Sequence, residues 1–199
     1  MEFLTPTHPK PKVVPSAPLR PPALAGWRIW LLLLSLFASA WGGDQVPKEY
    51  QVKAGFLYNF AKFIEWPSGS FDGADSPIVI GVWGENPFGN ELERLAKDHT
   101  INGRPIVIRS VQSAASARKT HLLFISTAED GRFPDLGDAF KGSGTLTVGE
   151  SEAFARRGGM ICFVPEGDKL RFEINIGAVG QAGLKVSAQL QKLARNIRR

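Results

Sequence analysis

The residues that could do acid–base, nucleophilic or metal chemistry are few and scattered in this chain. Beyond the first forty residues, histidine occurs at His99 and His121, and Cys162 is the single cysteine. His99 falls in a polar turn and His121 opens an apolar run, and neither a His-Glu-x-x-His nor a Cys-x-x-Cys spacing occurs. Cys162 has no neighbouring base, and the sequence lacks the Gly-x-Ser-x-Gly turn of a serine nucleophile. We therefore expect no metal, no cofactor and no enzymatic activity.

One glycine-containing loop, residues 84–89, follows a predicted strand and opens a predicted helix. It lacks the Lys-Ser/Thr pair of a P-loop and the spacing of a dinucleotide-binding loop, and Glu85 would repel a phosphate from that helix N-terminus. Two interpretations stay open. In the first, Asn86 caps the helix and Pro87 takes its first position. In the second, the loop is a recognition element at the carboxyl end of the sheet, with the side chains of Glu85, Asn86, Pro87 and Phe88.

Two further segments are expected beside this loop. Residues 126–127 and 149–151 follow the third and fourth predicted core strands, as residue 84 follows the first. The carboxyl ends of parallel strands meet at one edge of a sheet, so these segments would form a cleft there. Its polar side chains would include Ser126 and Glu150, and a small-molecule ligand could occupy it.

Two positions break the hydrophobic pattern. Lys53 lies at the centre of the apolar face of the first predicted helix. Either its stem covers core atoms while the ammonium reaches water, or it is buried and paired with a carboxylate, for which Glu173 is the best candidate. Arg171, Glu173 and Asn175 alternate with apolar residues in a predicted strand. They form either an exposed strand face with a local ion pair or a binding surface.

The first helix is predicted over residues 50–65 and is stopped by Trp66 and Pro67. At 100° per residue its apolar side chains share one face, and Asn59 lies at the edge of that stripe. The apolar residues are Val52, Phe56, Leu57, Phe60, Phe63 and Ile64. So many aromatic residues on one face predict a firm attachment of the helix to a core.

Beyond this helix, apolar runs alternate with helical patterns. Strands are predicted at residues 77–83, 105–109, 121–125 and 145–148, and helices at 90–97, 112–118, 134–141 and 152–156. Residues 160–164 and 170–176 flank a Pro-Glu-Gly-Asp turn and predict an antiparallel hairpin. The pattern predicts a single-domain α/β fold: a three-layer open sheet, mainly parallel, with a C-terminal antiparallel hairpin and flanking helices.

A final helix is predicted from the heptad-like spacing of four apolar residues after the hairpin, Val186, Leu190, Leu193 and Ile197. A single stripe of this kind is enough to dock the helix on its own sheet. Gly177, Gly180 and Gly183 precede it and predict a kinked or late start.

Residues 1–40 read as an export signal rather than part of the domain. Lys10, Lys12, Arg20 and Arg28 form a basic region, followed by an apolar run too short to span a membrane and by Ala38-Ser39-Ala40. We expect cleavage after Ala40, a domain over residues 41–199 with its core at about 46–194, and a periplasmic location. Removing four basic residues and one acidic residue lowers the net charge from +5 to +2, which argues against nucleic-acid binding. Within its apolar run, Cys162 is expected to be buried.

Several blocks together resemble the YfiR family of small periplasmic proteins, which includes HmsC. They lie at residues 50–67, 81–89, 102–104, 123–126, 146–149, 158–161, 171–175 and 182–184, so the match covers nearly all of residues 46–194. The first-helix and Arg-Phe-Glu-Ile-Asn blocks are the most specific. The positions that carry the motif and read as structural are Lys53, Tyr58, Asn59, Phe60, Trp66, Pro67, Gly158 and Gly159.

The resemblance implies a regulator. Family members repress an inner-membrane diguanylate cyclase by binding its periplasmic sensor domain, an outer-membrane lipoprotein can sequester them, and biofilm matrix follows the cyclic-di-GMP output. It also implies a dimer, in which part of the final helix or the Arg171–Asn175 strand face would meet its symmetry mate. The cysteine pairs of the best-studied members have no counterpart here, since Cys162 stands alone. An alternative hypothesis is that the chain is a periplasmic small-molecule binding protein that acts as a ligand sensor for a membrane sensor protein.

Overall fold

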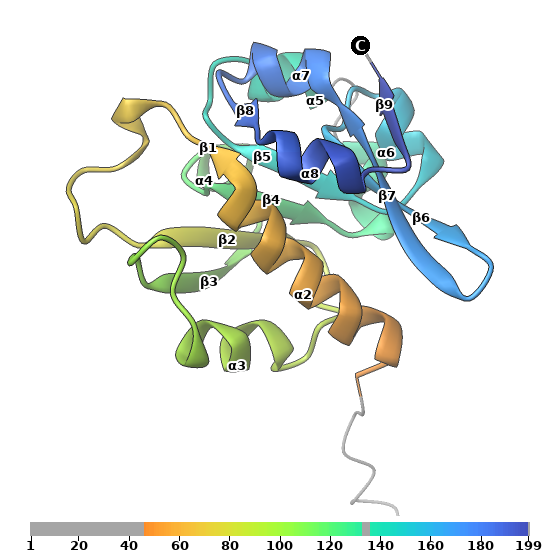
Figure 1. The fold of residues 1–199 in the computed structure, drawn as a ribbon, viewed down its shortest axis with the longest axis horizontal. Coiled ribbons are helices and arrows are strands. Elements are labelled where there is room, and N and C mark those ends of the chain that lie inside the picture. The colour runs from red at the N-terminus through yellow and green to blue at the C-terminus, as the bar shows by residue number, and fades with distance from the viewer. Residues whose placement is uncertain (1–45, 133–135, 199) are drawn as a thin grey trace, which may run out of the picture. The chain divides into compact units, whose positions relative to one another are not determined.

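The computed structural model describes residues 46–132 and 136–198 (Figure 1). Its core is a seven-stranded sheet in the order β3-β2-β4-β5-β6-β7-β9. The strands are β2 (Ile78–Trp83), β3 (Ile106–Val111), β4 (Leu122–Ile125), β5 (Leu146–Gly149), β6 (Ile161–Glu166), β7 (Lys169–Asn175) and β9 (Asn196–Arg198). All neighbours pair in parallel except β6 and β7, which form an antiparallel hairpin. The predicted α/β class and the hairpin are confirmed.

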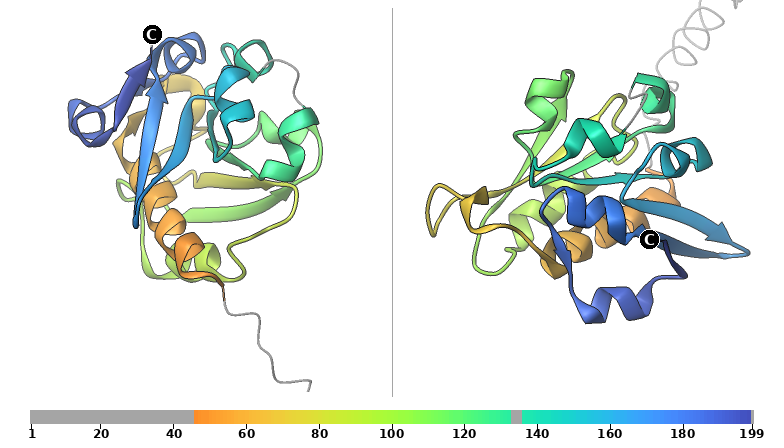
Figure 2. Two further views of the ribbon diagram at one scale, coloured as in Figure 1. Left: turned by 90° about the vertical axis from the view of Figure 1, so that its right-hand side faces the viewer. Right: turned by 90° about the horizontal axis from the view of Figure 1, so that it is seen from above.

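Helices cover both faces of this sheet. α2 (Lys48–Phe63), α3 (Glu91–Asp98) and α8 (Ala188–Leu193) lie on one face, and α4 (Ala114–Ala117), α5 (Leu136–Phe140) and α6 (Glu152–Arg156) lie on the other (Figure 2). Every residue of β2, β4 and β5 is buried, as expected for parallel strands enclosed between two helical layers. No helix in the described ranges is long and apolar enough to cross a membrane.

The first helix packs on the sheet through an aromatic cluster. The ring of Phe60, which is fully buried, lies 4.9 Å from that of Phe172 and 5.6 Å from that of Phe163 on the hairpin. Leu57 and Ala61 are also fully buried on this face, but Val52 is 44% exposed and lies outside the core. The attachment predicted from the aromatic stripe is confirmed for its central part.

The predicted end of this helix is wrong by two residues. α2 ends at Phe63, before Trp66 and Pro67, because Ile64–Glu65 form the short strand β1. β1 pairs antiparallel with β8 (Lys185–Val186), with Ile64 opposite Val186. A tertiary pairing with a segment far along the chain therefore overrides the local helical pattern.

The predicted continuous final helix is also wrong. The segment after the hairpin divides into α7 (Ile176–Gln181), β8, α8 and β9. Gly183 has a φ of +82°, the Ser187 side chain caps α8, and β9 pairs with β7. Leu190 is buried in the core, whereas Leu193 is 55% and Ile197 38% exposed. The four apolar residues thus do not form one stripe. The predicted signal sequence lies outside the described residues.

Candidate functional site

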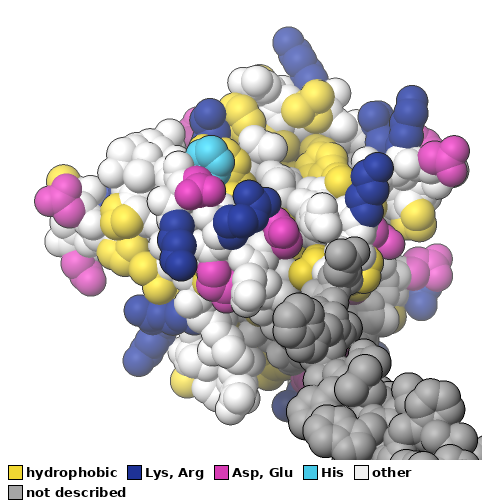
Figure 3. Space-filling model, turned by 90° about the horizontal axis from the view of Figure 1, so that it is seen from below, with side chains coloured by type: hydrophobic (Ala, Val, Ile, Leu, Met, Phe, Trp, Pro, Cys, Tyr) yellow, Lys and Arg dark blue, Asp and Glu magenta, His cyan; other side chains and the backbone are white. Residues whose placement is uncertain are grey.

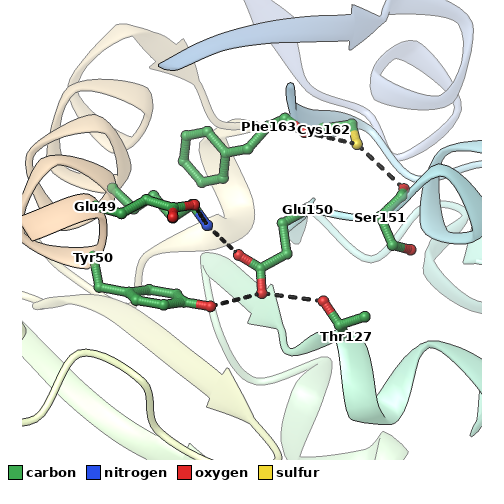
Figure 4. A network of polar contacts seen from close by, with 8 residues as sticks. Glu49, Tyr50, Thr127, Glu150, Ser151, Cys162 and Phe163 are labelled. Atoms are coloured by element: carbon green, nitrogen blue, oxygen red, sulfur yellow. Dashed lines mark hydrogen bonds and ion pairs between the residues drawn. The ribbon is translucent and has the colours of Figure 1, made fainter. Parts of the chain in front are cut away.

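The carboxyl ends of β4, β5 and β6 meet the first turns of α2, and a network of polar contacts joins them (Figure 4). Glu150, directly after β5, is its centre. Its Oε1 accepts hydrogen bonds from the Tyr50 hydroxyl and the Thr127 hydroxyl, each at 3.1 Å. Its Oε2 lies 2.5 Å from the Lys53 ammonium. The segments that the sequence predicted at this edge after β4 and β5 therefore do come together.

Lys53 is the buried cation of this network, with 3% of its surface exposed. Its Nζ also lies 2.5 Å from Glu49 Oε1 and 4.3 Å from the centre of the Tyr50 ring. Burial alone would lower the pKa of Lys53, but the hydrogen bonds to Glu150 and Glu49 and the negative charge of Glu150 raise it. Lys53 is therefore held as an ammonium. Burial, followed by the charge of Glu150, raises the pKa of Tyr50, which stays a neutral hydroxyl donor.

The prediction that Lys53 pairs with a buried carboxylate is confirmed, but the expected partner, Glu173, is wrong. The helix crosses the carboxyl edge of the sheet, where Glu150 emerges. Glu173 belongs to the opposite face of β7 from Phe172, the residue on which α2 packs. Its carboxylate lies 3.7 Å from Arg198 Nε instead.

Behind the network lies a group of buried polar atoms around Ser151. Its hydroxyl donates to Asp130 and accepts from the backbone N–H of Phe154, which caps α6. Cys162 Sγ donates to the backbone carbonyl of Ser151 at 3.3 Å. Burial raises the pKa of the Cys162 thiol to about 11, and Cys162 is buried as predicted. Burial likewise raises the pKa of Asp130. These groups support the edge structurally.

Three hollows adjoin the network. One of about 210 Å³ is lined by Glu49, Tyr50, Lys53, Thr127, Glu150, Phe163, Pro165 and Leu170. A second, of about 390 Å³, lies between α2 and the hairpin tip and shares Glu49, Pro165 and Leu170 with the first. A third, of about 400 Å³, opens on the side of α6 and includes Glu150, Cys162, Glu173 and Arg198. Glu150 therefore borders space on both sides of β6.

The glycine loop after β2 does not line these hollows. Asn86 Oδ1 accepts from the Phe88 N–H and its Nδ2 donates to the Gly89 carbonyl, so Asn86 stabilises a local turn. The interpretation of Asn86 as the helix cap is wrong, because α3 begins at Glu91. Phe88 is fully buried, with its ring 5.6 Å from that of Tyr50, while Glu85 and Asn86 are exposed and Pro87 is half-buried. The loop thus packs against the Tyr50 ring through Phe88.

Ser126 follows β4 but is buried, at 7% exposure. Its hydroxyl has no hydrogen-bond partner among the described residues and lies against Gly84, where a Cβ would collide with it. Gly84 also has a φ of +91°, so the close approach and the backbone both require glycine there. The residue of this segment that reaches the hollow is Thr127.

The Arg171–Asn175 row is occupied by local contacts. Arg171 lies 3.7 Å and Arg195 3.3 Å from the carboxylate of Glu166, and Asn175 caps α7 by accepting from the Ala178 N–H. With Glu173 beside Arg198, the row fits the interpretation of a strand face with local ion pairs.

The motif positions mostly serve the fold. Tyr58 donates to the Thr100 carbonyl, Asn59 to the Gly55 carbonyl, and Phe60 fills the core. Trp66 packs edge-on against His121, next to Pro67. Gly158 has a φ of +83°, and Gly159 leaves room for the Phe154 ring, with which any Cβ would clash.

The sequence interpretation missed Glu49 and Tyr50. The spacing of four residues between Glu49 and Lys53 is the signal that could have found the first, because such residues are neighbours on a helix. It also missed the role of His121, whose Nδ1 accepts from the Val79 N–H while Nε2 donates to the Ser70 carbonyl, both at 3.0 Å.

The described residues contain no group of three or more side chains placed to hold a metal ion. On the face shown in Figure 3, positive and negative side chains alternate and hydrophobic ones occur in small separate groups. No continuous basic surface is visible among the described residues of this face.

Two solved structures are similar to this chain at low sequence identity. A conserved domain protein from Vibrio cholerae matches at a TM-score of 0.50 and 13% identity, over 78% of this chain and 62% of that one. A structure described as the ABC domain in complex with L-Trp from Streptococcus pneumonia matches at a TM-score of 0.43 and 13% identity, over 60% of this chain and 56% of that one. The chain thus spans less than two thirds of either relative. At this identity the likeness concerns the fold alone.

A comparison with curated proteins gives no significant match. The family model described as YfiR/HmsC-like matches residues 50–195, from the second residue of the edge network almost to the end of the chain.

Proposed function

The chain belongs to the YfiR/HmsC-like family, and from that premise we propose that it is a non-catalytic periplasmic regulator that represses an inner-membrane signalling protein. The proposed partner is a diguanylate cyclase, bound through its periplasmic sensor domain, so that binding lowers cyclic-di-GMP output and biofilm formation. An outer-membrane lipoprotein that sequesters the regulator is a second proposed partner. The family match over residues 50–195 is the observation that carries this proposal.

The proposal is tested in cells and with purified proteins. Deleting the gene should raise cyclic-di-GMP, and the full chain should restore the low level, whereas a chain without residues 1–40 should not, because it stays in the cytoplasm. The exported protein should also bind the isolated sensor domain of the cyclase. An unchanged cyclic-di-GMP level after deletion would reject the cyclase as the partner.

We further propose a homodimer, as in relatives of this family. Leu193 and Ile197 are exposed large apolar side chains that lie close together in the sequence, at the end of α8 and on the edge strand β9. Light scattering on the exported protein should give twice the chain mass, and Leu193→Glu should lower it to one chain mass. A dimer that survives Leu193→Glu and Ile197→Glu would place the contact elsewhere.

A second candidate function is a ligand sensor whose ligand controls partner binding. The observation that favours it is the hollow at the carboxyl edge, where Lys53, Thr127 and Glu150 present polar groups beside Phe163 and Leu170. Open α/β sheets commonly bind ligands at this edge. Screening by thermal shift tests it, since a ligand at a hundred times its Kd adds about 2.7 kcal/mol of stability.

A further inference from the structure

The two carboxylates that contact Lys53 are held very differently. The side chain of Glu150 is 11% exposed and is fixed by the hydroxyls of Tyr50 and Thr127. The side chain of Glu49 is 60% exposed and reaches Lys53 from one turn earlier on the same helix. The Glu49 carboxylate is the solvent-exposed member of its pair and has, among the described residues, no second partner of the kind that fixes Glu150, so it is displaced from Lys53 at a lower cost than Glu150. Glu49 is therefore the exchangeable partner of a buried ammonium that requires negative charge.

Glu49 also stands where two hollows meet. The smaller, of about 210 Å³, contains the Lys53 ammonium together with the Tyr50 and Thr127 side chains. The larger, of about 390 Å³, continues between α2 and the hairpin tip and includes Val52 and Leu170. Glu49, Pro165 and Leu170 line both hollows, so the two adjoin along these side chains and together form one groove. The combined space lies in the range of roughly 300–1,000 Å³ that is usual for ligand sites.

The side chains that line this groove include a buried cation, apolar surfaces and exposed charges. At one end lies the Lys53 ammonium, which is 3% exposed and confined. In the middle lie apolar surfaces of Val52, Pro165 and Leu170, and Val52 is one of the large hydrophobic residues that the fold leaves exposed, at 44%. Lys48, Asp168 and Lys169 also line the larger hollow, so charges of both signs are present there.

We propose that this groove binds a monocarboxylate with an extended apolar body, such as a medium-chain fatty acid. Its carboxylate replaces Glu49 at Lys53, and its body covers Val52, Pro165 and Leu170. A single negative charge fits better than a phosphate dianion, because Glu150 lies 2.5 Å from the same ammonium and repels added negative charge. Glu49 is then an internal competitor for the site. The inference rests on the ligand-sensor candidate and names the ligand class.

The decisive experiment is titration calorimetry with decanoate below its micelle concentration. The full exported protein should bind one decanoate per chain. Acetate, which lacks the body, and 1-decanol, which lacks the charge, should bind far more weakly. Val52→Ser should weaken decanoate binding because it removes apolar surface from the groove.

The most specific outcome concerns Glu49→Gln. Removing the competing carboxylate should increase the affinity for decanoate by about two- to fivefold, the opposite of what loss of a ligand contact would do. Glu49 is exposed, so this variant should fold normally. Glu93→Gln, on α3 and outside both hollows, is the matched control and should leave the affinity unchanged.

Three results would overturn the inference. They are no binding of decanoate at millimolar concentration, binding of 1-decanol as tight as that of decanoate, and a lower affinity for decanoate in Glu49→Gln. If decanoate fails while a ligand of another class shifts the melting temperature, the ligand-sensor candidate stands and only the ligand class is wrong. If no class of ligand shifts it, both fail, and the proposed repressor function is untouched.

Discussion

Lys53 and Glu150 lie 97 positions apart in the sequence, yet their side chains form an ion pair of 2.5 Å at the carboxyl edge of the sheet. The pair joins the first helix to the segment that follows β5. Both side chains are largely removed from water, at 4% and 11% exposure. Burying either charge alone would therefore be costly, and each residue offsets part of the desolvation cost of the other.

Replacing only one residue of this ion pair should destabilise the protein strongly. Lys53→Met leaves Glu150 without its cation and should lower the free energy of unfolding by about 3–5 kcal/mol. The double variant Lys53→Met/Glu150→Gln should cost less than the two single variants together, because neither charge then remains. Urea unfolding of the four proteins gives the coupling energy.

The exposed pair between Arg156 and Glu152 on α6 is the control for this cycle. Its side chains are 65% and 86% exposed, so Arg156→Met should change stability by no more than about 1 kcal/mol. Additive effects at Lys53 and Glu150 would show that the two charges are not coupled.

A second prediction concerns His121 and acid. The neutral ring accepts from the Val79 N–H, donates to the Ser70 carbonyl, and stacks on Phe71 with ring centres 4.6 Å apart. Burial lowers the pKa of His121, and the nearby charge of Arg104 acts in the same direction. As pH falls below about 6.5, the unfolded chain binds a proton that the folded chain resists, so stability falls. Above that pH this contribution is fully present.

The measurement is the urea midpoint at pH 7.5 and pH 5.5. The wild-type midpoint should fall between these values, and His121→Asn, which cannot take up a proton, should show a smaller fall. His99→Asn, in the turn after α3, should behave like the wild type. An equal fall of the urea midpoint in all three proteins would show that His121 does not cause the loss of stability in acid.

The central sheet could be predicted from the sequence because its signal is local. The apolar runs of β2 and β4 and the Pro-Glu-Gly-Asp turn of the hairpin are contained in a few consecutive residues. The end of α2 and the division of the final helix could not be predicted, because the pairings of Ile64 with Val186 and of Ile174 with Ile197 decide them. Those pairings join segments far apart in the chain, and nothing in the sequence of one segment indicates that it pairs with the other.

The candidate site was predicted in part for the same reason. The break in the apolar face singled out Lys53, with a buried ion pair as one of two interpretations, and the strand ends placed Glu150 at the carboxyl edge. The sequence could not say that α2 crosses the carboxyl edge, so it gave no reason to prefer Glu150 over Glu173. The buried contacts of Tyr50 follow from the same crossing.

A third prediction separates two glycines by their surroundings. Gly159 lies against the Phe154 ring, where an added Cβ would collide, so Gly159→Ala should lower stability by about 1–3 kcal/mol. Gly55, inside α2, has nothing within 4 Å of an added Cβ. Gly55→Ala should therefore raise stability by about 0.5–1 kcal/mol through the helix backbone. Thermal unfolding of both variants distinguishes the signs, and a loss at Gly55 would contradict the packing described for α2.

A fourth prediction distinguishes two leucines of α8. Leu190 is 1% exposed and should cost about 2–5 kcal/mol when replaced by alanine. Leu193 is 55% exposed, and Leu193→Ala should stay within about 0.5 kcal/mol of the wild type at concentrations where the protein is a monomer. A large loss at Leu193 in the monomer would show that α8 docks by another face.

The last prediction concerns Cys162, the single thiol of the chain. Burial raises its pKa to about 11, and its Sγ donates to the Ser151 carbonyl. The thiolate is the reactive form of cysteine, and with this raised pKa little thiolate is present at pH 8. The side chain is also only 4% exposed. Ellman's reagent should therefore label the native protein slowly and the urea-unfolded protein at once. Because Cys162 Sγ is held against the Ser151 carbonyl, next to Glu150, Lys53→Met and Glu150→Gln should loosen this edge and speed native labelling, whereas the exposed control Arg156→Met should not. Rapid labelling of the native wild type would mean that this edge opens readily without any substitution.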